Sequence, residues 1–186
     1  MQNKVTIPKF FHELFGTEQT VIELLLVLIF TVGSIFTVGF LTHSEWSSLS
    51  LIRQIVLWFL YLDISGGIVA NLTHGTNSHY AKSSKSRWVF IAIHIQPLLL
   101  LIAYPDRWTA AITIWAFTIL SASLVNLLRK YDYHRTLAGF LIGILLILLF
   151  TYSPFVALPN LLKIIYSFYG FKVIYSFAVD HERKYT

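Results

Sequence analysis

Six long apolar runs constrain the fold of this chain more than any other feature of its sequence. Each is close to the ~20 residues that an α-helix needs to cross the hydrocarbon core of a bilayer. The 186-residue chain is 56% hydrophobic and 12% charged, which is more apolar than a typical soluble domain. We therefore predict an all-α fold, a polytopic membrane bundle of six transmembrane helices. The runs cover residues 21–41, 51–72, 88–104, 108–128, 136–152 and 158–179.

The segment ahead of the first run predicts a further helix that lies on the membrane surface. Pro8 suits the first turn of this helix, and an apolar face would follow it. That face would consist of Phe10, Phe11, Leu14 and Phe15. An alternative is that the helix docks a partner. We predict a cytoplasmic interfacial amphipathic helix at 1–19, a single six-helix transmembrane domain at 20–180 and a cytoplasmic tail at 181–186.

The basic residues are distributed unevenly, and their distribution predicts the orientation. Of the 14 Lys and Arg residues, most flank the runs on the side of the two termini, whereas Arg53 and Arg107 lie on the other side. Basic flanks stay in the cytoplasm, so we predict a multi-pass protein of the cell membrane with both termini cytoplasmic. This topology, with contacts to anionic membrane lipid, explains the net charge of +5 without nucleic-acid binding.

The composition and the spacing of ligand residues exclude several kinds of site. The chain has no cysteine, which excludes disulfides, thiolate zinc sites and iron–sulfur clusters. No two histidines have the i, i+4 spacing of a helical metal motif, and there is no P-loop or dinucleotide fingerprint. We predict no metal site, and the sequence identifies no cofactor.

Three ionisable side chains inside the predicted spans lie at one depth. At a rise of about 1.5 Å per residue, Asp63, His94 and Lys172 lie roughly 12, 9 and 10 Å inside the cytoplasmic ends of their helices. Such side chains are costly in lipid and usually face a bundle interior or a water-filled cavity. We predict that they converge on a pocket that opens to the cytoplasm. The Asp63 carboxylate would pair with Lys172 or with protonated His94.

Small residues and a proline near these side chains favour a pocket. Gly66 and Gly67 share a helix face with Asp63 and remove side-chain bulk beside the carboxylate, which leaves space for either a closely packed neighbour or a ligand. Pro97 follows His94 by three residues and cannot donate the hydrogen bond that would continue the helix. The sequence therefore predicts a kink beside His94.

Residues 63–71, with the sequence DISGGIVAN, resemble the first half of the CDP-alcohol phosphotransferase signature. Members of that family also have six helices and a cytoplasm-facing site. In this chain Gly66 stands at the position of the second Asp, Asn71 replaces the Arg, and the later acids of the signature are missing. Asp63 alone could not hold two metal ions, so the resemblance does not imply the family's activity.

The loop at residues 72–87 is rich in hydroxyl, amide and basic side chains and contains no acid. These groups can donate hydrogen bonds to an anionic headgroup, which makes His79, Tyr80 and Arg87 ligand-binding candidates. Asn71 and Asn126 lie within about one turn of the same interface and are candidates too. The alternative is an ordinary solvated, basic cytoplasmic loop.

We interpret the polar cluster as the site of an enzyme or a binding protein for a lipid or another amphiphilic small molecule. His94 would act as general acid or base, Asp63 would orient or ionise it, and Lys172 with Asn71 would hold an anionic group. One alternative is a small-solute or proton-coupled transporter with Asp63 as its titrating group. Another is a structural or regulatory subunit in which these residues form only a buried ion-pair network.

A pair of glycines in the fifth run, Gly139 and Gly143, predicts close helix packing. Small residues at this spacing let two backbones approach each other. The contact would lie inside the bundle or between two copies of the chain in a homo-oligomer.

Overall fold

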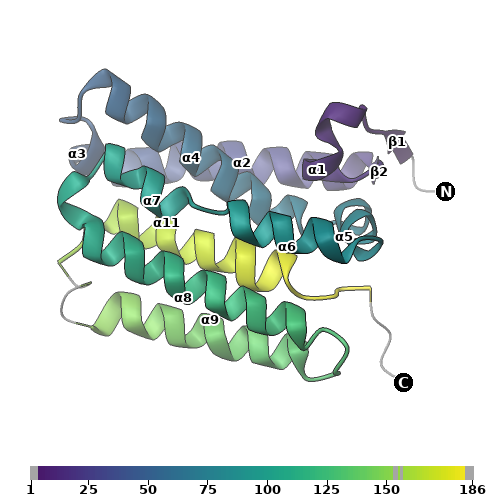
Figure 1. Ribbon diagram of the computed structural model, residues 1–186. Coiled ribbons are helices and arrows are strands. Elements are labelled where there is room, and N and C mark those ends of the chain that lie inside the picture. Colours follow the sequence, from purple (N-terminus) through teal and green to yellow (C-terminus); the bar gives the residue numbers. More distant parts are fainter. Residues whose placement is uncertain (1–3, 153–154, 156, 183–186) are drawn as a thin grey trace.

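The structure, a computed structural model, describes residues 4–152, 155 and 157–182. Apart from two short strands it is helical, as the sequence predicts (Figure 1). Its elements, in chain order, are β1 (Lys4–Thr6), η1 (Lys9–Phe11), α1 (His12–Phe15), β2 (Glu18–Thr20), α2 (Val21–Leu41), α3 (His43–Trp46), α4 (Leu51–Ala70), α5 (His74–Ala81), α6 (Ser84–Ile93), α7 (Gln96–Leu99), η2 (Leu100–Ile102), η3 (Pro105–Arg107), α8 (Trp108–Leu127), α9 (His134–Thr151), α11 (Asn160–Gly170) and η4 (Phe171–Phe177).

Among the described residues, five helices are long and apolar enough to cross a membrane, which is compatible with a multi-pass membrane protein. They correspond to the first five predicted runs. The sixth run forms α11 and η4, which are not among these five, so the count of six spans stays a prediction. The five are Val21–Leu41, Leu51–Ala70, Ser84–Ile102, Pro105–Leu127 and His134–Thr151.

The N-terminal segment differs from the amphipathic helix predicted for residues 1–19. In residues 4–20, called here the N-terminal hairpin, β1 pairs antiparallel with β2, and η1 and the single-turn α1 lie between them. A continuous helix cannot form because Gly16 has a left-handed φ of 68° and ends α1. The hairpin then leads into α2, where Thr20 and Glu23 form a capping box.

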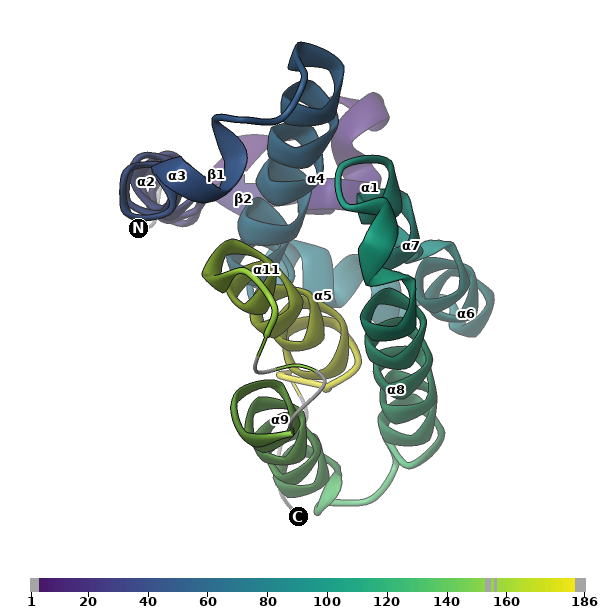
Figure 2. The same cartoon turned by 90° about the vertical axis from the view of Figure 1, so that its left-hand side faces the viewer.

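Helix α11 and its continuation η4 form the centre of the bundle. They pack against α4, α8 and α9, and Figure 2 shows α11 between these three helices. Their inward side chains are almost fully buried, including Leu161, Ile165, Tyr166, Tyr169 and Ile174. By contrast, α2 packs mainly on α4 and exposes most of its apolar residues. The core of the protein therefore surrounds its last helical segment.

Two interruptions of regular helix lie beside α4. The chain leaves helix at His94 and Ile95, between α6 and α7, as the lack of an N–H at Pro97 predicts. The second interruption is the change from α-helix to π-helix at Phe171, which continues to Phe177. Such π segments are rare and occur frequently at functional sites. Both interruptions contact α4, because η4 packs against it and Gln96 hydrogen bonds to Asp63.

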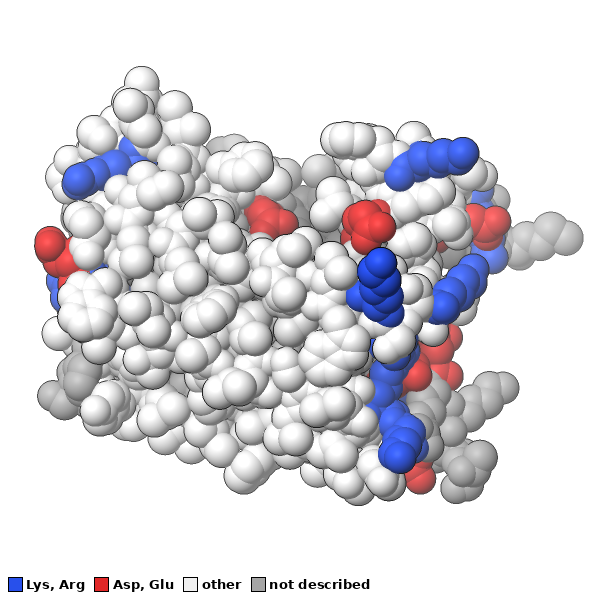
Figure 3. Space-filling view, in the orientation of Figure 1, with Lys and Arg blue, Asp and Glu red and all other residues white. Residues whose placement is uncertain are grey.

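Charge is distributed unevenly between the two ends of the bundle. Figure 1 shows the N-terminal hairpin and the segment after η4 at the same end. On the face in Figure 3, most of the Lys and Arg residues gather at that end, and the broad middle is nearly free of charge. The unevenness agrees with the distribution in the sequence, whereas the orientation relative to a membrane stays a prediction.

The glycine pair of α9 does not pack inside the bundle. A Cβ added to Gly139 or Gly143 would meet no atom within 4 Å among the described residues. Packing within one chain is therefore the wrong interpretation of this pair. Contact between two copies of the chain stays a prediction.

Candidate functional site

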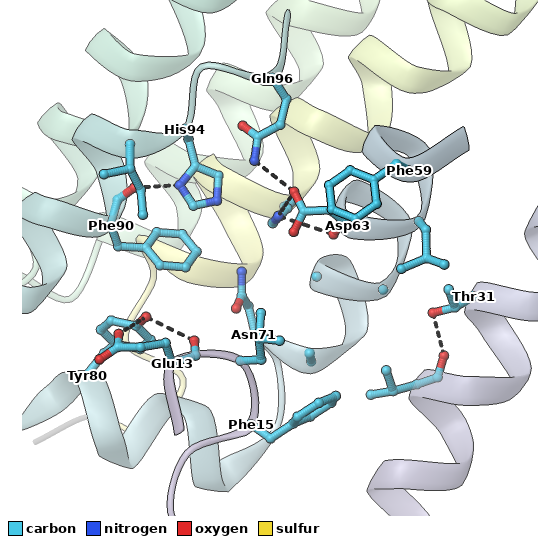
Figure 4. A pocket seen from close by; sticks show the side chains of 18 of the residues that line it. Glu13, Phe15, Thr31, Phe59, Asp63, Asn71, Tyr80, Phe90, His94 and Gln96 are labelled. Atoms are coloured by element: carbon cyan, nitrogen blue, oxygen red, sulfur yellow. Dashed lines mark hydrogen bonds and ion pairs between the residues drawn. The ribbon is translucent and has the colours of Figure 1, made fainter. Parts of the chain in front are cut away.

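A cavity of about 1030 Å³ lies between α2, α4 and α6, and Figure 4 shows the side chains around it. Its walls are mostly apolar, with Leu28 and Val32 from α2 and Val89 and Ile93 from α6. The face of α4 that begins at Phe59 forms its floor. Specific ligand sites have this character, with apolar walls and a few polar groups that fix the orientation of the ligand. We call this cavity the pocket.

The polar centre of the pocket is an ion pair between α4 and η4. Lys172 Nζ lies 2.9 Å from Asp63 Oδ2 and also donates to the Asp63 backbone oxygen at 3.2 Å. Gln96 Nε2 donates to the same carboxylate oxygen at 2.8 Å. The pairing of Asp63 with Lys172 that helix depth predicts is therefore confirmed. Lys172 is only 3% exposed, so its charge depends on this one carboxylate.

Gly67 makes the approach of Lys172 to Asp63 geometrically feasible. A Cβ at position 67 would overlap Cε and Cδ of Lys172. The lysine side chain therefore passes over the bare backbone of α4 to reach the carboxylate one turn away. The adjacent glycines predicted space beside the carboxylate, and at Gly67 the Lys172 side chain of η4 fills it as a closely packed neighbour.

The imidazole of His94 lies at the break between α6 and α7 and is 4% exposed. Its Nδ1 hydrogen bonds to the Phe90 backbone oxygen, and the backbone oxygen of His94 accepts from the Tyr169 hydroxyl at 2.6 Å. A carbonyl can only accept, so Nδ1 carries a proton. Burial disfavours the charged imidazolium, and in the neutral ring the unprotonated Nε2 is an acceptor. Figure 4 shows that the ring points from the break toward Asp63, with Nε2 on the side of the pocket.

Two further amide groups in the pocket have buried atoms without a hydrogen-bond partner. Asn71 is 4% exposed, and its Nδ2 has no partner among the described residues. Figure 4 shows this amide pointing into the pocket, toward His94. Oε1 of Gln96 also lacks a partner in the described part of the chain. Buried polar atoms are seldom left unpaired, so these two mark where a ligand or water would bind.

The N-terminal hairpin covers the end of the pocket that the sequence predicts to open to the cytoplasm. Glu13, Leu14 and Phe15 line the pocket there. The Tyr80 hydroxyl holds them by donating to Glu13 Oε2 at 2.7 Å and to the Glu13 backbone oxygen at 3.0 Å. Burial and the nearby carboxylate raise the pKa of Tyr80, so it remains a donor above neutral pH. The predicted open funnel is therefore capped in this structure.

A second set of contacts fixes the same hairpin to α5. Gln19 is buried, and its Nε2 donates to Phe15 O and to Thr73 Oγ1, each at 2.6 Å. The backbones of Gly16 and Gly75 touch so closely that a Cβ on either would overlap the other segment. The hairpin is therefore an integral part of the fold.

Three of the predicted ligand-binding residues lie outside the pocket. Arg87 Nε donates to Asn126 Oδ1 at 3.0 Å, which ties α6 to α8, and its Nη1 donates to Tyr80 O at 3.1 Å. His79 faces Glu13 across 3.7 Å. Neither Arg87, Asn126 nor His79 lines the pocket, whereas Asp63, His94, Lys172, Asn71 and Tyr80 all do. The structure thus brings together five of the eight predicted residues.

Sequence reasoning missed Gln96 and Phe90. Gln96 is one residue from Pro97, so its position at a predicted helix break was an available signal for a freed polar side chain. Phe90 stacks on Phe177 with ring centroids 3.5 Å apart and supports the His94 ring at 4.0 Å. Its backbone oxygen also fixes the imidazole. The role of Phe90 depends on tertiary contacts that leave no mark in the sequence.

Metal ligation has no support in the described residues, where no group of three or more His, Asp or Glu side chains is placed to hold an ion. What the pocket offers instead is hydrogen bonding and proton transfer. It combines a neutral imidazole, a carboxylate and two amides with extended apolar walls.

No protein family, curated protein or solved structure matches the chain. Its function is therefore inferred from the pocket itself.

Proposed function

We propose that this chain is an integral membrane protein with six spans and cytoplasmic termini, and that it is an enzyme or a binding protein for an amphiphilic ligand. The ligand's polar head would lie beside Asp63, His94 and Asn71, and its apolar chain would follow the walls of α2 and α6. The single observation that carries the proposal is the pocket, whose apolar walls enclose a compact polar cluster.

The exposed residues on the rim favour entry from the side, out of the bilayer. Several apolar residues line the pocket and are at least half exposed, including Leu28 and Phe59 on one side, and Val89 and Ile93 on the other. Because the N-terminal hairpin covers the cytoplasmic end of the pocket, a molecule dissolved in the lipid reaches the pocket more directly than one dissolved in the cytoplasm. An amphiphile could keep its chain in lipid while its head reaches the polar cluster.

His94 is the residue best placed for chemistry. Its Nε2 faces the pocket, while Phe90 O and Tyr169 hold the ring and the backbone on the opposite side. A neutral imidazole held in this way can accept a proton from a ligand group and return it. The nearby Asp63 carboxylate would stabilise the imidazolium that forms. Lys172 would keep that carboxylate ionised.

Retention of lipid during purification tests whether the pocket binds an amphiphile. We expect Ile93→Trp to fill the mouth of the pocket and abolish retention, measured by native mass spectrometry after detergent exchange. Ile147→Trp on α9 is the matched control, because Ile147 and Ile93 are 63% and 62% exposed and Ile147 does not line the pocket. Equal retention by wild type and both variants would contradict the proposal.

The variant His94→Gln separates an enzyme from a binding protein. If His94 transfers protons in a reaction, the variant accumulates substrate, and the mass of its retained ligand differs from that of the wild type. If the protein only binds, the two retained ligands have the same mass. Loss of stability with no change in retained ligand in either amount or mass would favour a purely structural polar network.

A further inference from the structure

We propose that the ligand's head is an uncharged hydroxyl group, as in a long-chain or polycyclic alcohol, held between His94 Nε2 and Asn71 Nδ2. This inference rests on the proposed function and names the ligand class of the same pocket. It also replaces the anionic group that the sequence analysis assigns to Lys172 and Asn71.

Lys172 has little left to offer an anion. Its ammonium group already donates to the carboxylate of Asp63 at 2.9 Å and to the backbone oxygen of Asp63 at 3.2 Å. The two opposite charges neutralise each other within the protein, and the His94 ring is neutral in the arrangement described above. Lys85 and Glu13 also line the pocket, but both are exposed and lie on α6 and the N-terminal hairpin, outside the polar cluster. A charged head placed between His94 and Asn71 would therefore be desolvated beside a charge pair that is already neutralised, which is unfavourable.

The groups that remain free form a donor and an acceptor. His94 Nε2 accepts, because the proton of the ring is at Nδ1, where it is donated to Phe90 O. Asn71 Nδ2 is buried without a partner and can only donate. A hydroxyl group satisfies both, since it has one hydrogen to donate to His94 and lone pairs that accept from Asn71. Gln96 Oε1 is a further buried acceptor without a partner among the described residues that line the pocket.

Other simple heads satisfy this pair less well. A carboxylate or phosphodiester anion could accept from Asn71, but it has no hydrogen for Nε2 and its charge would be unpaired. An ammonium could donate to His94 and Gln96, yet it has no acceptor for Asn71. The apolar lining provides for the rest of the molecule, with Val27 and Leu28 of α2 opposite Val89 of α6.

Photoaffinity labelling in proteoliposomes of phosphatidylcholine tests the inference directly. The probes are a long-chain alcohol, the corresponding carboxylic acid and the corresponding alkylammonium, each with the same photoreactive group in the chain. We expect the alcohol to label peptides of α2, α4 and α6 about tenfold more than either charged probe. If a charged probe labels these peptides as strongly as the alcohol, the inference is wrong and the proposed function stands. If no probe labels them, the proposed function fails as well.

The variant Asn71→Leu tests the hydrogen bond itself. Asn71 bonds to its neighbours through its backbone, where its oxygen accepts from Asn77 at 2.8 Å, so the substitution preserves that contact. We expect labelling by the alcohol to fall about tenfold. Asn126→Leu removes a buried amide outside the pocket and should leave labelling unchanged, although it costs the contact with Arg87. Undiminished labelling of a folded Asn71→Leu protein would overturn the assignment.

Discussion

Helices α8 and α9 are uninterrupted along their length, as are α2 and α4, whereas the two other helical segments that reach the pocket are not. α6 stops at Ile93, α7 begins at Gln96, and the last helical segment changes to a π-helix at Phe171. The difference follows the polar residues, because an irregular backbone frees groups that need partners where water is scarce. Tyr169 supplies one such partner to the backbone oxygen of His94. The comparison shows that this fold concentrates its irregularity at the pocket.

The largest expected effect comes from breaking the ion pair on the irregular side. Asp63→Ala leaves the buried Lys172 without its counter-charge and should lower the free energy of unfolding by about 3–5 kcal/mol, measured by denaturant titration in detergent. Lys4→Met is the control, because the Lys4–Glu18 pair is 60% and 55% exposed and should contribute under about 1 kcal/mol.

The double variant Asp63→Asn, Lys172→Met sharpens this result. It removes both charges together, so most of the stability lost in Asp63→Ala should return. A double variant that is less stable than Asp63→Ala would mean that the charges stabilise the protein separately and that the pairing contributes little.

A matched pair of glycine substitutions compares the two regions directly. Gly67→Ala forces the Lys172 side chain to move and should cost about 1–3 kcal/mol of stability. Gly143→Ala on α9 meets no neighbouring atom within one chain and should be neutral or stabilising by up to about 1 kcal/mol. Thermal unfolding of both proteins checks the contrast. A large loss in Gly143→Ala would instead indicate that α9 packs against a second copy.

The smallest expected effect concerns the N-terminal hairpin. Tyr80→Phe removes the hydrogen bonds to Glu13 and should weaken docking of the hairpin by about 1 kcal/mol, measured as faster proteolysis within residues 4–20. The exposed Tyr133 provides the control variant, Tyr133→Phe, which should change nothing.

The same hydrogen bond predicts a dependence on pH. Because the pKa of Tyr80 is raised in the folded protein, its contribution is complete below the ordinary tyrosine pKa of about 10 and is lost as the pH rises through the higher folded value. The wild type should therefore release the hairpin only in strong alkali. This alkaline step should be missing from Tyr80→Phe, and its persistence would assign the transition to another group.

The sequence was sufficient for features that depend on length, depth or a single residue type. Apolar runs predicted the five long helices, Pro97 predicted the break after His94, and equal depth predicted that Asp63 and Lys172 meet. Each of these follows from local chemistry and from the regular rise of a helix.

Features that depend on tertiary contacts could not be predicted in the same way. The hairpin forms because Gly16 fits against the backbone of Gly75, which lies far away in the sequence. The π segment has the sequence FKVIYSF, which contains no glycine or proline that would predict a departure from α-helix. Donor chemistry predicts Arg87 as a ligand-binding residue, and depth predicts Asn126. Neither criterion says which way a side chain points, and in the structure the two bind each other.

Glu45, at the end of the bundle opposite the hairpin, accepts from the backbone N–H groups of Asn160 and Leu161 at 3.1 and 2.7 Å. These contacts fix the start of α11 and set the axial register of everything that follows it, including Lys172 roughly 17 Å further along. A slip of one turn would move the ammonium about 5.4 Å, out of reach of Asp63. The two hydrogen bonds to Glu45 at one end of the bundle thus help to place the Lys172 ammonium at the level of Asp63, nearer the other end.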